Sequence, residues 1–222
     1  MYNQLVMPTF TTEGIIVKRS NFGEADRILT IITPYKGKIR VIAKGVRRIT
    51  SRRAGNVEVL NKVKLQIFQG KGMEILTEAE ALLTFPKIKN DLIMSTYGSH
   101  LAELSERFLP EGQPNPAIYQ LLSATLELLE KNPRQIFIRA FEVKLLSLLG
   151  FWSLNQVELD PPSAEEIGVI LEKLQKGTWQ EIAQMEMNKS QALALEKILR
   201  YYIEKILESK LKSLKVLADL VK

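Results

Sequence analysis

The sequence predicts an α+β protein in which a five-stranded β-barrel of the OB type is followed by an all-α helical domain. Two observations lead to this prediction. Up to about residue 86, apolar and polar residues alternate in short runs separated by turn residues, as in half-buried strands. From residue 90 onward, apolar residues recur at helical spacing. We therefore expect a barrel domain over residues 1–86 and a helical domain over residues 87–222.

Five segments of the first domain have the alternating pattern of a strand. They are Thr12–Lys18, Arg27–Thr33, Lys38–Ala43, Val57–Phe68 and Met73–Leu83. Turn residues such as Pro34-Tyr35-Lys36-Gly37 separate them. An open sheet of such short strands would expose unpaired edges, and closure removes these edges. We therefore expect the five strands to form a closed barrel.

Helix-start signals divide the second domain. Pro116 and Pro133 each occupy a first-turn position, and Ser163 and Thr178 each begin a capping-box pattern. The predicted helices are Asp91–Leu109, Pro116 to about Leu129, Pro133 to about Leu149, two shorter ones after Ser163 and Thr178, and a long one from about Lys189 to Val221.

The residue content excludes most enzyme chemistry. The chain has no cysteine, which excludes a disulfide scaffold, a cysteine-ligated zinc site and a catalytic thiol. Its one histidine, His100, leaves neither a Ser-His-Asp triad nor a multi-histidine metal site. His100 lies on the apolar stripe of the first predicted helix, where we expect a structural role. We expect no catalytic residue, no cofactor and no metal.

No segment predicts a membrane span or an export signal. The first ten residues lack the charged and apolar regions of a signal peptide. The longest apolar stretch, Leu145–Trp152, is much shorter than the roughly 20 residues that span a bilayer. We therefore expect a cytoplasmic protein.

The positive charge is concentrated in the predicted barrel. Residues 1–86 hold 14 basic and 7 acidic side chains, whereas residues 87–222 hold 17 and 18. Eight cations fall between residues 36 and 53 without one carboxylate: Lys36, Lys38, Arg40, Lys44, Arg47, Arg48, Arg52 and Arg53. Such a segment repels itself unless a polyanion neutralises it, which favours nucleic acid as the partner. The alternative is a solvated loop that only aids solubility.

Two aromatic residues lie in predicted turns beside these cations. Phe22 and Tyr35 are candidates for stacking on bases, as aromatic side chains do in proteins that bind single strands. The alternative is that either ring caps the core of the barrel.

Several short motifs in this chain match a known family. The strongest are Glu13–Val17, Phe22–Arg27, Thr33 with Gly37–Ile39, and above all Ala43–Arg48 followed by Ser51-Arg52. Looser matches are Arg139–Glu142, Leu145-Leu146, Leu149–Phe151 and Leu211–Ser213. In these residues the chain resembles the bacterial RecO family of recombination mediators. The resemblance is strong before Gly55 and looser over the rest of the chain.

The resemblance implies a function in DNA repair and homologous recombination, in association with the nucleoid. RecO proteins bind single- and double-stranded DNA and anneal complementary strands without nucleotide hydrolysis. Their partners are the acidic C-terminal tail of single-stranded DNA-binding protein (SSB) and RecR, with which they help to load RecA. Many members also carry a four-cysteine zinc module, for which this chain has no cysteine.

The resemblance also suggests roles for particular residues. The eight cations of segment 36–53 would neutralise phosphates in a salt-dependent contact that is indifferent to sequence. In the helical domain, Arg139 matches an arginine of the family. Together with Phe141 and Leu145 it is predicted to bind the SSB tail, through a charge-assisted contact beside an apolar pocket. The alternative is an arginine on an exposed helix face.

Two other functions stay open from the sequence. An RNA-binding barrel would have the same composition, because cationic OB surfaces serve both nucleic acids. A non-enzymatic adaptor would use the basic loop to bind an acidic protein. An enzyme ranks last, because no catalytic constellation can be assembled.

Overall fold

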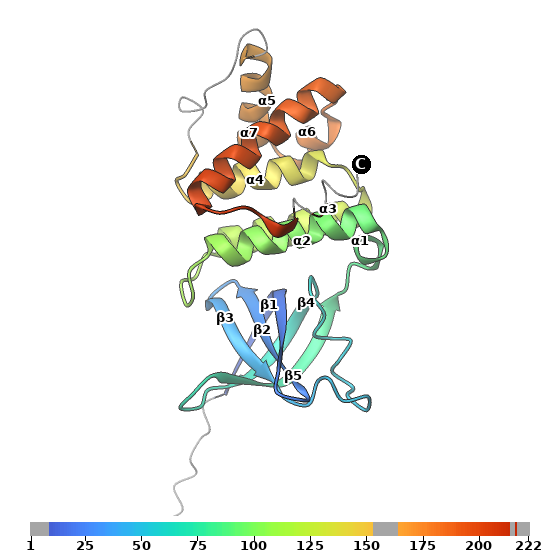
Figure 1. The fold of residues 1–222 in the computed structure, drawn as a ribbon, viewed down its shortest axis with the longest axis vertical. Coiled ribbons are helices and arrows are strands. Elements are labelled where there is room, and N and C mark those ends of the chain that lie inside the picture. Colours follow the sequence, from blue (N-terminus) through green and yellow to red (C-terminus); the bar gives the residue numbers. More distant parts are fainter. Residues whose placement is uncertain (1–8, 153–163, 214–215, 217–222) are drawn as a thin grey trace, which may run out of the picture.

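The strands close into a five-stranded barrel that carries the helices at one end (Figure 1). The computed structural model describes residues 9–152, 164–213 and 216. The strands are β1 (Thr9–Phe22), β2 (Asp26–Thr33), β3 (Gly37–Ala43), β4 (Lys62–Phe68) and β5 (Glu74–Leu83). They follow the order β1-β2-β3-β5-β4, and β1 pairs with β4 to close the barrel. All pairs are antiparallel except β3 with β5. The predicted OB-type barrel followed by helices is confirmed.

The helices stack above the barrel in two layers (Figure 1). They are α1 (Pro86–Asn90), α2 (Leu92–Phe108), α3 (Pro116–Lys131), α4 (Ile136–Leu148), α5 (Ala164–Lys176), α6 (Trp179–Gln184) and α7 (Lys189–Leu207). Helices α2 and α3 lie next to the barrel, and α4 to α7 lie beyond them. Within the described residues, no helix has the length and apolar content of a membrane span.

A strand segment buried on both faces joins the barrel to the helices. Residues 14–17 of β1 are all buried. Ile16 belongs to the core of the barrel, whereas Ile15 and Val17 belong to the core of the helical domain. A strand with one solvated face alternates buried and exposed residues, so a continuous buried run requires a packed layer on each side. The barrel and the helices therefore bury each other's apolar surface.

The segment before β4 differs most from the predicted strands. The sequence predicts a strand from Val57, but β4 begins at Lys62 and a loop rich in turns precedes it. Val57 is buried in the barrel core, whereas Leu60 is buried in the helical core with a φ of 72°. The Asn61 side chain donates to two backbone carbonyls of the loop, at 3.0 and 2.9 Å. The apolar pattern here thus reflects a buried loop and not strand pairing.

Three helix boundaries also differ from those predicted. The short helix α1 precedes the expected first helix, with Pro86 in its first turn. Helix α4 begins at Ile136 instead of Pro133. Helix α7 ends at Leu207 because Glu208 takes the left-handed conformation, with a φ of 51°. The predicted helix start at Ser163, and residues 214–215 and 217–221 of the predicted last helix, lie outside the described residues.

Gly37 allows the barrel to approach the loop between α2 and α3. It has a φ of 69°, and an added Cβ would lie 2.3 Å from the carbonyl oxygen of Gln113. At the next residue, the carbonyl of Lys38 accepts a hydrogen bond from the N–H of Gly112 at 3.0 Å. The backbone conformation and the close approach therefore both require glycine.

We expect Gly37→Ala to reduce the free energy of unfolding more than Gly23→Ala does. Gly23 also has a positive φ, of 56°, but an added Cβ there meets nothing within 4 Å. Gly23→Ala should therefore cost only the backbone strain, about 1–2 kcal/mol. The overlap with Gln113 should raise the cost of Gly37→Ala to about 3 kcal/mol or more. Urea unfolding of both variants measures the difference, and equal midpoints would contradict this account of Gly37.

Candidate nucleic-acid interface

Strand β3 spreads the predicted cationic segment along the barrel. Lys36 and Lys38 lie at its first end, beside the helices, and Lys44 follows its last residue. Seven residues of strand extend about 20 Å. The cations that are neighbours in sequence therefore form two groups at opposite ends of the barrel, with Arg40 exposed between them.

Two of the eight cations, Lys38 and Arg53, bind backbone carbonyls and are only partly exposed. The Lys38 Nζ donates to the carbonyl of Glu106 in α2 at 2.6 Å. The Arg53 guanidinium donates to the carbonyls of Leu76, Thr77 and Lys44 at 3.1, 3.0 and 2.8 Å, which ties the loop to β5. The sequence predicts both residues as phosphate contacts. Because their head groups are turned to the backbone, we assign them to the structure of the barrel instead.

Residues 44–53, here called the basic loop, are held in place mainly by backbone contacts. A carboxylate oxygen of Asp26 accepts from the N–H of Gly45 at 2.7 Å, and the carbonyl of Ala25 accepts from the N–H of Arg47 at 2.9 Å. Inside the loop, the N–H of Ser51 donates to the carbonyl of Arg48 at 2.9 Å. These bonds fix the loop on the β1–β2 turn and leave most of its cationic head groups available.

Three cations of the basic loop have unpaired charges. Lys44, Arg48 and Arg52 are exposed, and their side chains have no hydrogen bond or ion pair within the part of the chain that the structure describes. They line an open hollow of about 600 Å³, together with Gly45, Thr50, Ser51, Arg53 and the carboxylate of Asp26. The three cations outnumber this carboxylate, which accepts from the N–H of Gly45, and with the hydroxyl groups they suit phosphate oxygens.

The other three cations of the segment are exposed and have only weak partners. The Lys36 Nζ lies 4.8 Å from the centroid of the Phe10 ring. Nε of Arg40 lies 3.9 Å from a carboxylate oxygen of Glu111, and Arg47 donates to the carbonyl of Gly23 at 3.2 Å. Exposed pairs of this kind contribute about 0–1 kcal/mol. All three side chains can therefore exchange these partners for a phosphate at low cost.

Both aromatic candidates are exposed, but they lie at opposite ends of the barrel. Phe22 is 47% exposed and is the last residue of β1, not a turn residue. It pairs with Asp26 and so lies at the end that carries the basic loop. Tyr35 is 76% exposed in the β2–β3 turn beside the helices. Neither ring belongs to the barrel core, so the alternative that they cap it is wrong.

The predicted site for the SSB tail lies inside the helical domain. Arg139 is 2% exposed, and Phe141 and Leu145 are fully buried. The Arg139 guanidinium donates to both carboxylate oxygens of Glu142, at 2.7 and 3.0 Å. Because α4 is packed between α3, α5, α6 and α7, a partner could reach these side chains only by opening the core. We therefore correct this prediction, since the three are core residues.

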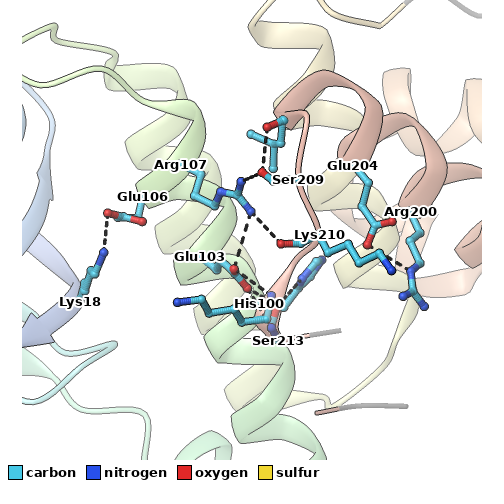
Figure 2. A network of polar contacts seen from close by, with 12 residues as sticks. Lys18, His100, Glu103, Glu106, Arg107, Arg200, Glu204, Ser209, Lys210 and Ser213 are labelled. Atoms are coloured by element: carbon cyan, nitrogen blue, oxygen red, sulfur yellow. Dashed lines mark hydrogen bonds and ion pairs between the residues drawn. The ribbon is translucent and has the colours of Figure 1, made fainter. Parts of the chain in front are cut away.

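The single histidine connects this ion pair to the segment that follows α7. Figure 2 shows His100 and Glu103 of α2 beside Ser213 of that segment. His100 Nε2 lies 2.7 Å from Glu142 Oε1, and its Nδ1 lies 3.0 Å from the Ser213 hydroxyl. Glu103, in the same helix, accepts from the N–H groups of Lys212 and Ser213 at 3.0 and 2.9 Å. The full burial and two hydrogen bonds of His100 are those of a structural histidine.

The carboxyls of this network have lowered pKa values. Burial raises the pKa of Glu142, but the charge of Arg139 and the bond with His100 outweigh it, and the net pKa is below the ordinary value. Burial also raises the pKa of Glu103. The hydrogen bonds that Glu103 accepts from Ser213 and Lys212 outweigh burial and lower its pKa as well. Both groups therefore stabilise the fold as carboxylates.

Comparison with known proteins places the chain in a family. A family model described as Recombination protein O N terminal matches residues 7–85, which contain the barrel. A second, described as Recombination protein O C terminal, matches residues 89–152, which contain α2 to α4. The chain belongs to the recombination protein O (RecO) family. The resemblance predicted from the motifs is confirmed.

Three relatives named DNA repair protein RecO are similar to this chain over stretches of similar length. The one from Symbiobacterium thermophilum is 34% identical over 148 residues, which are 65% of this chain and 58% of the relative. The one from Dehalococcoides mccartyi is 37% identical over 143 residues, or 64% and 56%. The one from Acetivibrio thermocellus is 38% identical over 143 residues, or 63% and 57%. The chain thus spans less than three-fifths of the length of these RecO relatives.

A zinc module of the four-cysteine kind does not fit this RecO-family chain. The sequence has no cysteine to ligate the ion. Over residues 9–152 and 164–213, no group of three or more histidine or carboxylate side chains is arranged to hold a metal. We therefore derive no role for zinc.

Glu103→Gln tests the contribution of the network to stability. At pH 7 we expect the free energy of unfolding to fall by about 1–3 kcal/mol, because a charged acceptor of three hydrogen bonds becomes neutral. The folded pKa of Glu103 is below its ordinary value of 4.5. Its contribution is therefore complete above pH 4.5 and is lost as the pH falls through the folded pKa.

The difference between parent and variant should consequently shrink at acid pH. Urea unfolding at pH 7 and pH 3 measures it. An equal difference at both pH values would show that the charge of Glu103 does not hold Lys212 and Ser213 on α2.

Proposed function

We propose that this RecO-family chain binds DNA through the basic loop of its barrel and anneals complementary strands in DNA repair and homologous recombination. The observation that carries the proposal is the set of unpaired cations, Lys44, Arg48 and Arg52, around an open hollow at one end of an OB-type barrel. The family and the name of its relatives support a role in DNA repair.

The loop suits a polyanion whose sequence varies. Its cations would contact phosphates, which every strand presents at regular spacing, so the contact is indifferent to base sequence. Because backbone hydrogen bonds already fix the loop, binding does not require the loop to be ordered first. Phe22, exposed at the same end, would stack on a base and add about 1–3 kcal/mol for a single strand.

Annealing by this surface needs no catalytic group. Two complementary strands repel each other through their phosphates, and a cationic surface open to solvent screens this repulsion while it holds them close. Arg40, Arg47 and Lys36 extend the positive surface along the barrel. We therefore propose a non-enzymatic mechanism that is independent of ATP and acts on single- and double-stranded DNA at the nucleoid.

We extend the proposal to three protein partners: the SSB tail, RecR and, indirectly, RecA. The support for these partners is membership of the RecO family. No docking residue is assigned to them. The SSB tail would have to bind residues other than Arg139, Phe141 and Leu145, because these three are buried.

The pair Arg48→Glu and Arg52→Glu tests the proposed surface. Neither side chain has a partner in the described residues, so reversing both charges should leave the fold intact. We expect the double variant to anneal complementary DNA oligonucleotides at least tenfold more slowly than the parent, in the absence of ATP. A fluorescence-quenching assay measures the rate, and circular dichroism checks the fold.

Lys87→Glu with Lys131→Glu is the matched control, because both lysines are exposed on the helical domain and the charge change is the same. We expect this control to anneal nearly as fast as the parent. Equal rates for all three proteins would reject the basic loop as the site. Activity on RNA strands alone would favour the RNA-binding alternative.

Salt dependence distinguishes a DNA-binding protein from an adaptor. Four exposed cations of the basic loop, Lys44, Arg47, Arg48 and Arg52, predict a log–log slope of about −3 for a homopolymeric single strand. The double variant should roughly halve this slope. Fluorescence anisotropy over a salt series measures both. If no binding occurs even at low salt, the loop would instead bind an acidic protein.

A further inference from the structure

Helix α7 exposes a row of side chains in which lysines alternate with apolar residues. The row is Lys189, Leu193, Lys197, Tyr201 and Lys205, spaced four residues apart, and all five are exposed. Leu193 is 58% exposed and Tyr201 is 60% exposed. Each step rises about 6 Å along the helix, so the row is about 24 Å long. We call it the α7 row.

The opposite side of the helix explains why these residues are not needed for packing. Leu195, Leu199 and Ile203 are buried in the helical core and follow the same four-residue spacing. They hold α7 on the domain, and the α7 row lies mostly in solvent, although the Tyr201 ring packs edge-on against Tyr202 with 5.8 Å between the ring centroids. Its apolar members, Leu193 and Tyr201, therefore expose apolar surface to water. This exposure is unfavourable in free energy, and a bound partner would remove it.

The positive charge of the α7 row is not neutralised by the helix itself. The two carboxylates within α7, Glu196 and Glu204, pair with Arg139 and Arg200 at 3.8 and 3.4 Å. The Lys205 Nζ lies 5.6 Å from the centroid of the Tyr201 ring. Glu166, an acidic side chain of the neighbouring helix α5, accepts a hydrogen bond at 3.3 Å from Gln191, which is not a member of the row.

The α7 row lies far from the basic loop. In Figure 1, α7 crosses the upper part of the helical domain, and α2 and α3 separate it from the barrel. The basic loop begins at the end of β3 that faces away from the helices. The family models match residues 7–85 and 89–152, so α7 also lies outside the matched region. One strand lying in the hollow of the basic loop would leave the α7 row accessible to another.

We propose that the α7 row is a second nucleic-acid contact that holds another strand on the same molecule. Cations interleaved with an aromatic ring are the chemistry that single strands require, with phosphates on the lysines and a base on the ring. A long row of separated charges suits an extended polyanion, which offers a phosphate wherever a lysine lies. The proposal rests on the proposed function, since it gives the annealing activity a place for each strand.

The test counts strands per chain. At low salt, the parent should bind two copies of a dodecamer of thymidylate per chain in native mass spectrometry, which also reports the number of protein chains. The triple variant Lys189→Gln, Lys197→Gln and Lys205→Gln should bind one, because glutamine keeps the helix propensity and removes the charge. Its annealing rate should fall at least fivefold, while its affinity for the first strand stays within twofold of the parent.

Matched variants separate this proposal from the proposed function. The control Lys87→Gln, Lys131→Gln and Lys173→Gln removes three exposed lysines elsewhere on the helical domain and should still bind two strands. Arg48→Glu with Arg52→Glu should also bind one strand, at the α7 row. If that double variant still binds two strands, the basic loop is not a DNA-binding site, which contradicts the proposed function. If the α7 triple variant still binds two and anneals at the parent rate, the α7 row proposal is overturned.

Tyr201 provides a second measurement that does not depend on charge. Tyr201→Leu keeps an apolar residue but removes the ring, and should weaken the second strand about tenfold without affecting the first. An unchanged second affinity would overturn the stacking role. If the α7 triple variant instead loses only the binding of an acidic peptide, with nucleic acid unaffected, the α7 row would be a protein-binding surface and the proposal would be wrong.

Discussion

The architecture depends on one short segment of β1 that is buried on both sides. Within this segment, residues 15–17 supply side chains to the helical core and to the barrel core in alternation, so neither core is complete without the other. Leu60, at the end of the loop before β4, is buried in the helical core as well. The loop between β3 and β4, which includes the basic loop, thus starts at the end of the barrel away from the helices and ends with Leu60 packed against them. Both ends of this charged loop are therefore held in place.

Charged side chains of the described residues show two contrasting arrangements, one buried and paired and the other exposed and unpaired. Inside the helical domain, Arg139, Glu142 and His100 are buried together, and Glu142 binds both of the others, since burial of a charge requires a partner. On the basic loop, Lys44, Arg48 and Arg52 are solvated and have no internal partner in the part of the chain described. Repulsion among them is an energetic cost in the free protein, and a bound polyanion would relieve it. The first arrangement stabilises the fold, and the second is available for binding.

The sequence predicted the barrel well and the roles of individual charges less well. Alternation and turn residues located all five strands, because period-two burial is a local property. Segment 57–61 was wrongly predicted as a strand. Its apolar residues Val57 and Leu60 are buried in two different cores, and such residues give the same apolar pattern as a strand. Arg139 was misread because an arginine in a helix is usually exposed. Its spacing of three residues from Glu142 was a signal for an internal ion pair.

The sequence by itself determined the fold class, the family and the excess of cations in one short segment, since these follow from local patterns and composition. Only the tertiary structure decided which cations are free. Lys38 and Arg53 meet carbonyls from Glu106 and β5, far away in sequence, and strand β3 places Lys36 and Lys44 at opposite ends of the barrel. Whether a charged group meets water or a buried partner depends on contacts between distant segments, and no local pattern contains that information.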